Sequence, residues 1–286
     1  MPLTMFKNSL LYITMWFATS LAVGVSCGQN LIAGYDFSDP DRVMVLAKSL
    51  SEISGLASGP KGQLYAVQDE KGTIFQLNPE DGSILAEQKF YGSGDFEGIE
   101  RIGNVMFILR SSGHLFEVEL GQKARSNTVR KSRLKLPAGC DAEALGSDID
   151  VGTLWVACKN ADGVKGKRTR SLFRLSANEG KWENDFVLSI DQKMLNDSNG
   201  ASKWSIGDFM PSGLTLKGDI TFVLSAVSDL LLVIQPHRTD IIELSALGLK
   251  QAEGIAIDRE GTLYIASEGA GSRGKILAFR HDLTTR

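Results

Sequence analysis

Acidic side chains recur at one position of a repeated tripeptide. Glu97 and Glu253 each precede Gly-Ile, Glu143 precedes Ala-Leu, and Asp95 and Asp141 stand two residues before two of these glutamates. Residues two apart on a strand point to the same side, so strands directed at a common axis would bring these carboxylates together. Calcium takes six to eight oxygen ligands in a flexible geometry. The pattern therefore predicts a site for calcium, or another hard cation, formed by these five residues.

A second interpretation of the same glutamates stays open. They can accept hydrogen bonds from neighbouring backbone amides, or pair with Arg110 and Lys159 near the ends of the following strands, since crowded carboxylates are relieved by basic partners as well as by a cation. Two repeats carry a hydroxyl in place of the acid, at Ser54 and Ser212, so we expect an asymmetric site. Three acids near the following strand ends are candidates for additional ligands: Asp69, Asp229 and Glu268.

Signals for catalysis are weak in this sequence. The three histidines, His114, His237 and His281, lie away from the expected convergence of the acids, and no nucleophile elbow, phosphate loop or zinc spacing occurs. These features favour a non-catalytic binding or scaffold module; the alternative is a calcium-dependent lactonase or esterase, in which the cation would polarise a carbonyl. The net charge of −3 and the absence of a basic stripe argue against nucleic acid as a partner.

The tripeptides that carry these acids begin a longer repeat. Markers at 54–56, 97–99, 143–145, 212–214 and 253–255 are each followed by two further apolar segments rich in β-branched and aromatic residues, which is typical of strands. The second strands are expected at 63–68, 105–110, 153–158, 220–225 and 262–267. The third strands are expected at 73–77, 114–120, 171–175, 230–234 and 275–279. Thirty glycines against seven prolines fit many strands joined by tight turns.

The repeat length indicates an all-β propeller. The central marker residues recur every 41 to 46 residues, with one interval of 69, and about 40 to 50 residues make one four-stranded blade. We therefore expect five four-stranded blades, with the extra residues of the long interval in the segments 160–170 and 193–209. Six blades is the alternative, if that insertion forms strands of its own.

The last blade needs a strand from the other end of the chain. Only three strands follow Glu253, whereas the apolar segment 42–50 precedes its marker much as 241–249 precedes Glu253. We expect this N-terminal strand to close the last blade, because joining both ends of the chain in one sheet removes open edges.

The N-terminus predicts export. Lys7, an apolar run over 10–25 and small residues before Cys27 have the parts of a secretory signal, and the small residues before the cysteine resemble a bacterial lipoprotein processing site. We predict a signal peptide over 1–27 with lipidation at Cys27, a linker over 28–41 and one propeller domain over 42–286. The protein would then be a lipoprotein of the bacterial cell envelope, anchored to the membrane by its lipid. An uncleaved anchor and a plain secretory signal remain alternatives.

The other two cysteines, Cys140 and Cys158, stand at the start and end of two expected antiparallel strands. In an oxidising compartment they could form a disulfide, although their expected register is diagonal and a bridge would need local adjustment. Buried free thiols are the other interpretation.

Three features together resemble the SdiA-regulated, YjiK/CarP-like propeller family of bacterial envelope proteins: the succession of EGI-type markers, the phrase CDAEAL followed by LWVACK, and the lipoprotein-like signal. The resemblance runs from about residue 36 to residue 280. It implies a membrane-associated propeller with a connection to calcium, and it assigns no reaction. We expect a monomer whose partner is an unknown envelope protein or small ligand.

Overall fold

The inner strands of this protein are buried on both faces, which is why apolar residues run through them with little alternation. In the strand Val105–Arg110, for example, the four central residues are all buried. The computed structural model describes residues 31–120, 129–148, 151–159, 169–199 and 204–282. The chain divides into two units, Met1–Asn30 and Leu31–Arg286; the predicted signal peptide and Cys27 lie outside the described residues.

Two antiparallel sheets of four strands come first along the chain, in the orders β2-β3-β4-β5 and β6-β7-β8-β9. The first contains β2 (Ile53–Ser58), β3 (Leu64–Gln68), β4 (Lys71–Leu77) and β5 (Ile84–Ser93), with a 3-10 turn, Pro60–Gly62, between β2 and β3. The second contains β6 (Phe96–Ile102), β7 (Val105–Arg110), β8 (His114–Glu119) and β9 (Val129–Arg133).

The next eight strands form one sheet, in the order β13-β12-β11-β10-β14-β15-β16-β17. Two antiparallel groups of four are joined in it by a single parallel pair, Asp148 with Leu216. The first group is β10 (Ala142–Asp148), β11 (Thr153–Cys158), β12 (Arg170–Asn178) and β13 (Lys181–Ile190). The second is β14 (Gly213–Lys217), β15 (Ile220–Ser225), β16 (Leu230–Gln235) and β17 (Arg238–Glu243). The short helix α1 (Gln192–Asp197) lies in the expected insertion.

The last sheet combines both ends of the described chain. Its order is β1-β20-β19-β18, formed by β1 (Arg42–Val45), β18 (Ala252–Ile257), β19 (Leu263–Ser267) and β20 (Lys275–Phe279). The pairing of β1 with β20 is antiparallel, with Val43 opposite Leu277, so the expected N-terminal strand does complete this sheet. The strands β1 and β17 are shorter than expected, because 3-10 turns at Lys48–Leu50 and Ser245–Leu247 follow them.

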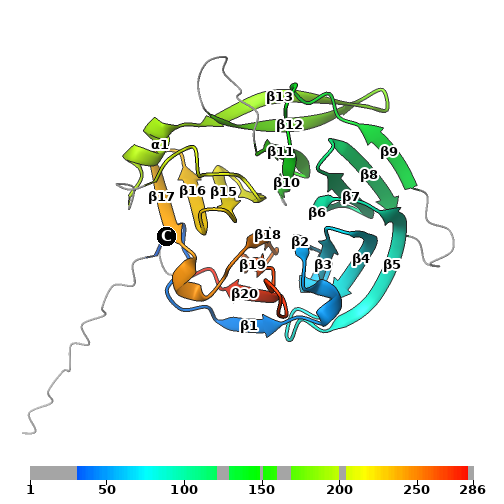
Figure 1. Ribbon diagram of the computed structural model, residues 1–286, viewed down its shortest axis with the longest axis horizontal. Helices are drawn as coiled ribbons and strands as arrows, with labels where there is room; N and C mark the ends of the chain where they lie inside the picture. Colours follow the sequence, from blue (N-terminus) through cyan, green and yellow to red (C-terminus); the bar gives the residue numbers. More distant parts are fainter. Residues whose placement is uncertain (1–30, 121–128, 149–150, 160–168, 200–203, 283–286) are drawn as a thin grey trace, which may run out of the picture. The chain divides into compact units, whose positions relative to one another are not determined.

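The first strands of the repeats lie nearest a common centre (Figure 1) and contact one another in the cyclic order β2-β6-β10-β14-β18-β2. Small marker residues permit these contacts. A Cβ atom at Gly55 would lie 2.9 Å from the Cα of Gly98, one at Gly98 would lie 2.7 Å from the Cβ of Leu145, and one at Gly254 would lie 2.9 Å from the Cβ of Leu56. The arrangement is that of a β-propeller, in which sheets radiate from a centre lined by their innermost strands.

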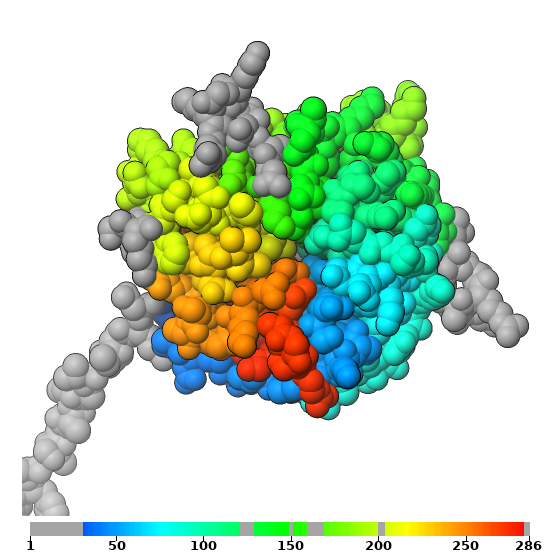
Figure 2. Space-filling model, viewed as in Figure 1, coloured from blue at the N-terminus to red at the C-terminus, as the bar shows by residue number. Residues whose placement is uncertain are grey.

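The hydrophobic core lies between neighbouring sheets. One cluster, for example, packs Phe96 and Phe116 of the β6–β9 sheet against Ile74 and Phe90 of the β2–β5 sheet, and comparable clusters join the remaining neighbours. In the space-filling view these sheets follow one another in chain order around the visible face (Figure 2). None of the helices in the described part of the chain is long and apolar enough to span a membrane.

The segment expected to be a linker is, in its described part, packed onto the domain. Tyr35 is fully buried and Phe37 nearly so, in the cluster that also holds Phe222 and Phe279. The Tyr35 hydroxyl donates a hydrogen bond of 2.8 Å to the carbonyl of Gly261. Residues 31–41 therefore belong to the folded unit, because their two aromatic side chains complete its core.

Candidate cation site at the ends of the innermost strands

A β-bulge places the predicted acids. The antiparallel registers shift between Phe96 and Gly98, between Ala142 and Ala144, and between Ala252 and Gly254, so that each marker glutamate is the extra residue of its strand. A bulge leaves its extra residue outside the ladder and re-aims the side chain. The bulges explain how Glu97, Glu143 and Glu253, which lie on three different sheets, come near enough to affect one another's pKa.

The two hydroxyl markers have a structural use instead. Ser54 is also the extra residue of a bulge, and its Oγ donates to the carbonyl of Phe96 on the next innermost strand, at 2.5 Å. Ser212 Oγ donates to the carbonyl of Ala252 at 2.8 Å. Both serines thus tie one innermost strand to the next.

Glu97 carries the largest perturbation among the marker acids. Burial raises its pKa from 4.5 to about 9, and the charge of Glu143, a hydrogen bond with Asp95 and the charge of Glu253 act in the same direction. A carboxyl surrounded in this way stays protonated at neutral pH. The predicted acids Glu97, Glu143 and Glu253 are therefore close enough to repel one another.

Two acids from second-strand ends join this group. Burial and the charge of Glu268 raise the pKa of Glu253, and burial, Asp69 and Glu52 raise that of Glu268. Burial, followed by Glu52, also raises the pKa of Asp69. We refer to Asp69, Glu97, Glu143, Glu253 and Glu268 as the central acidic cluster.

A lysine side chain, that of Lys159, forms an ion pair with an acid of the cluster. Lys159 Nζ lies 3.0 Å from Glu143 Oε2, and the Glu143 side chain is only 12% exposed. Burial still raises the pKa of Glu143, while Lys159 lowers it and Asp141 raises it. Pairing with Lys159 is thus realised at Glu143, whereas the Nε of Arg110, the other expected partner, is buried without a hydrogen bond.

The donor set suits a hard cation in its chemistry, although it is not assembled as a ligand shell. Within the described residues, no three His, Cys, Asp or Glu side chains stand close enough together to hold a metal ion. Asp69 Oδ1, however, is buried without a hydrogen-bond partner, and an unpartnered carboxylate oxygen beside other carboxyls is relieved by a cation. Filling such a site would require side-chain rotation and release of protons.

Other acids fall outside the cluster or were missed by the motif. Asp229 has a pKa raised by burial alone. Glu100, on the same strand as Glu97, is 5% exposed, accepts a hydrogen bond of 2.8 Å from Ser147 Oγ, and has its pKa raised to about 8 by burial. Glu52 was also missed; the sequence signal for it is an acid two residues before the Ser54 marker.

The cysteine that precedes β10, the strand that carries Glu143, is bonded to the last residue of β11. Cys140 and Cys158 form a disulfide with a Cα separation of 5.1 Å. Cys158 lies opposite Ala142 in the antiparallel register, so Cys140 is diagonal to it, and the turn in which Cys140 donates its N–H to the carbonyl of Pro137 brings it within reach. The bridge therefore joins the two strands that present Glu143 and Lys159.

Comparisons with known proteins agree with this architecture. A family model described as SdiA-regulated matches residues 41–270. The structure is similar to that of glutaminyl cyclase from Myxococcus xanthus, with a TM-score of 0.54 and 15% identity over 85% of this chain and 95% of that one. It is also similar to a luciferin-regenerating enzyme, with a TM-score of 0.53 and 12% identity over 85% and 95% of the two chains. At these identities the two structures share the fold alone.

Proposed function

This chain belongs to the SdiA-regulated family, and we propose that it is a non-catalytic binding module of the bacterial cell envelope that holds calcium, or another hard cation, in the central acidic cluster. The observation that supports this function best is the raised pKa of Glu97, to which burial and then acids from two other sheets contribute. Carboxyl groups brought together in this way bind a cation in exchange for protons, because the cation removes their mutual repulsion.

Calcium fits this cluster better than magnesium. It accepts carboxylate oxygens in a flexible arrangement, whereas magnesium requires octahedral order and retains most of its water. Glu97, Glu143 and Glu253 would supply oxygens from three sheets, and Asp69 Oδ1 is an oxygen without a partner. In the cation-free protein, Lys159 pairs with Glu143 and supplies the positive charge that the cation would otherwise bring. Lys159 would therefore leave Glu143 when the cation binds.

The proposed ring has five blades. The cyclic contacts of β2, β6, β10, β14 and β18 support this number, because each innermost strand then begins one four-stranded blade. The single Asp148 to Leu216 pair that merges two blades into one sheet is a local contact between neighbouring innermost strands. The described part of the long insertion holds the helix α1 and no additional strand, which supports five blades over six.

Calcium titration of the full chain by calorimetry tests the cation. We expect binding that strengthens as the pH rises, because Glu97 and Glu253 must lose protons, and that weakens by about tenfold or more when both are changed to Gln. Glu119→Gln, a change at an exposed acid outside the cluster, should bind as the wild type does. Absence of calcium binding by the wild type would refute the cation site. Hydrolysis of lactones or aryl esters by the calcium-loaded protein would show that it is a hydrolase and not a non-catalytic binding module.

Membrane attachment through Cys27 is proposed from the sequence. A lipidated Cys27 followed by a folded unit would tether the ring to the envelope membrane as a monomer, available to an envelope protein or small ligand. In bacteria grown with labelled palmitate, we expect the full chain to incorporate label and the Cys27→Ala chain to remain unlabelled and unattached. Attachment of the Cys27→Ala chain to membranes at the wild-type level would contradict the proposal.

A further inference from the structure

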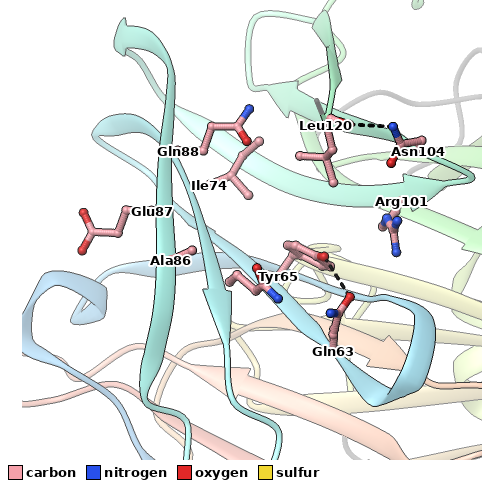
Figure 3. A pocket seen from close by; sticks show the side chains of 10 residues that line it. Gln63, Tyr65, Ile74, Ala86, Glu87, Gln88, Arg101, Asn104 and Leu120 are labelled. Carbon is pink, nitrogen blue, oxygen red and sulfur yellow. Dashed lines mark hydrogen bonds between the residues drawn. The ribbon is translucent and has the colours of Figure 1, made fainter. Parts of the chain in front are cut away.

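A polar pocket of about 310 Å³ lies between the β2–β5 sheet and the β6–β9 sheet. Its volume is at the lower end of the range found for small-molecule sites. Figure 3 shows side chains of the two sheets facing each other across it, with Tyr65 and Gln88 on one side and Arg101 and Asn104 on the other, while Glu87 points away. The pocket is separate from the marker acids, since none of them lines it.

Arg101, at the end of β6, brings an uncompensated positive charge to this pocket. Its Nε and Nη1 are buried and have no hydrogen-bond partner, and none of the ion pairs among the described residues includes it. The guanidinium lies over the ring of Tyr65, with Cζ 5.6 Å from the ring centroid. This cation–π contact satisfies neither nitrogen, and buried charged donors are unfavourable without an acceptor.

Close packing holds Arg101 in this position. A Cβ atom at Gly59 would lie 2.6 Å from the Tyr65 ring and 3.1 Å from Arg101 Nη1. The absence of a side chain at Gly59 therefore leaves room for both groups. The Tyr65 hydroxyl in turn donates to Gln63 Oε1 at 3.1 Å, which orients the ring beneath the guanidinium (Figure 3).

Carboxamides form most of the remaining polar wall. Gln88 Nε2, on β5, is a third buried donor without a partner. Gln63, Gln76 and Asn104 also line the pocket, and Asn104 is held by a bond of 2.6 Å from its Nδ2 to the carbonyl of Leu120. Carboxamides donate and accept, so they match hydroxyl groups, whereas a guanidinium matches a planar carboxylate through two parallel hydrogen bonds.

We propose that this pocket binds a small hydroxylated carboxylate of sugar size, of the uronic-acid type. Its carboxylate accepts hydrogen bonds from the Arg101 guanidinium, its hydroxyls meet Gln88 and the neighbouring carboxamides, and its apolar face packs against Tyr65. The lining carries one positive charge directed inward, which suits a single carboxylate better than a phosphate dianion.

The test is calorimetric titration of the full chain with D-glucuronate, D-glucose, D-gluconate and D-glucose 6-phosphate. We expect glucuronate to bind and glucose, which lacks the carboxylate, to bind at least about tenfold more weakly. Binding of gluconate as strong as that of glucuronate would show that the open-chain form satisfies the same pocket. Equal binding of glucose, stronger binding of glucose 6-phosphate than of glucuronate, or no binding of glucuronate up to the millimolar range would each overturn the proposal.

Variants locate the binding in the pocket. Arg101→Gln should weaken glucuronate binding about tenfold or more without lowering the melting temperature, because it removes a buried charge that has no partner. Arg174→Gln, at an arginine that is exposed and paired with Asp185, should bind as the wild type does. Gln88→Leu removes an independent donor and should also weaken binding. Unchanged glucuronate affinity in both Gln88→Leu and Arg101→Gln would assign any binding to another site.

Discussion

Gly213→Ala should lower the free energy of unfolding by about 3 kcal/mol, the upper part of the range for overpacked sites. A Cβ atom there would lie 2.5 Å from the carbonyl oxygen of Glu253 and 2.8 Å from Leu224 Cδ1. The Glu253 carbonyl belongs to the backbone of the next innermost strand, which the Ser212 hydroxyl also holds through the carbonyl of Ala252. The methyl group can be accommodated only if β14 and β18 move apart, and this would open the ring at its centre.

Denaturant unfolding of Gly213→Ala measures this effect, with Gly92→Ala as the matched control. Gly92 is exposed at the end of β5, and a Cβ atom there meets no atom within 4 Å. Its replacement should change stability by only about 0.5 kcal/mol, and in the stabilising direction if the unfolded chain loses entropy. Equal effects of the two changes would show that the innermost strands do not depend on close contact at the markers.

The same close contacts explain why the fold could be predicted from the sequence. A small residue is required wherever one innermost strand touches the next, so the marker recurs with the blades and can be counted without a structure. Three second strands, β7, β11 and β15, have the predicted bounds, because the turns before them and the loss of apolar residues after them mark both ends. The N-terminal strand could be assigned because the last sheet would otherwise lack its outer strand.

Side-chain contacts between distant residues outside the repeat pattern were not predicted. The packing of Tyr35 onto Phe222 joins segments far apart in the chain. Two aromatic residues in a short polar stretch do not show whether that stretch is a linker or packs onto the domain. The pocket at Arg101 belongs to the same class. Its guanidinium is significant because Tyr65 lies beneath it and because no ion pair in the described part of the chain includes it. Neither fact has a sequence pattern.

The candidate site was predicted in part. The repeat and the alternation of side chains along a strand are enough to predict that Glu97, Glu143 and Glu253 lie near one another on the innermost strands. Alternation cannot reveal that each is the extra residue of a bulge. It also cannot reveal that Lys159 pairs with Glu143, whereas the Nε of Arg110 is buried without a hydrogen bond. Choice of partner depends on side-chain reach across strands, and a linear pattern of residues does not encode that reach.

Stability of this protein should fall as the pH rises from about 5 to about 9, and Glu97→Gln should remove one part of that loss, because other acids with raised pKa values contribute the rest. Glu97 has a pKa of about 9 in the folded protein and an ordinary value of 4.5. Between these values the folded state holds a proton that the unfolded state has released, so each increase in pH favours unfolding. The stabilisation is fully present below the unfolded pKa and is lost as the pH passes through the folded pKa. We expect the wild type to lose up to about 5 kcal/mol more than Glu97→Gln across this range, since one pKa unit corresponds to about 1.4 kcal/mol and the range spans about four pH units.

Unfolding curves at several pH values, with and without calcium, separate this effect from the cation site. Without calcium, Glu119→Gln should retain the wild-type slope, whereas parallel curves for Glu97→Gln and the wild type would show that Glu97 ionises normally. With calcium, the wild type should regain stability most strongly above pH 8 or so, because a bound cation stabilises the carboxylate form that high pH produces. A pH slope that calcium does not alter would mean that the cluster carries protons only, and that its repulsion is relieved by protonation and by Lys159 rather than by a metal.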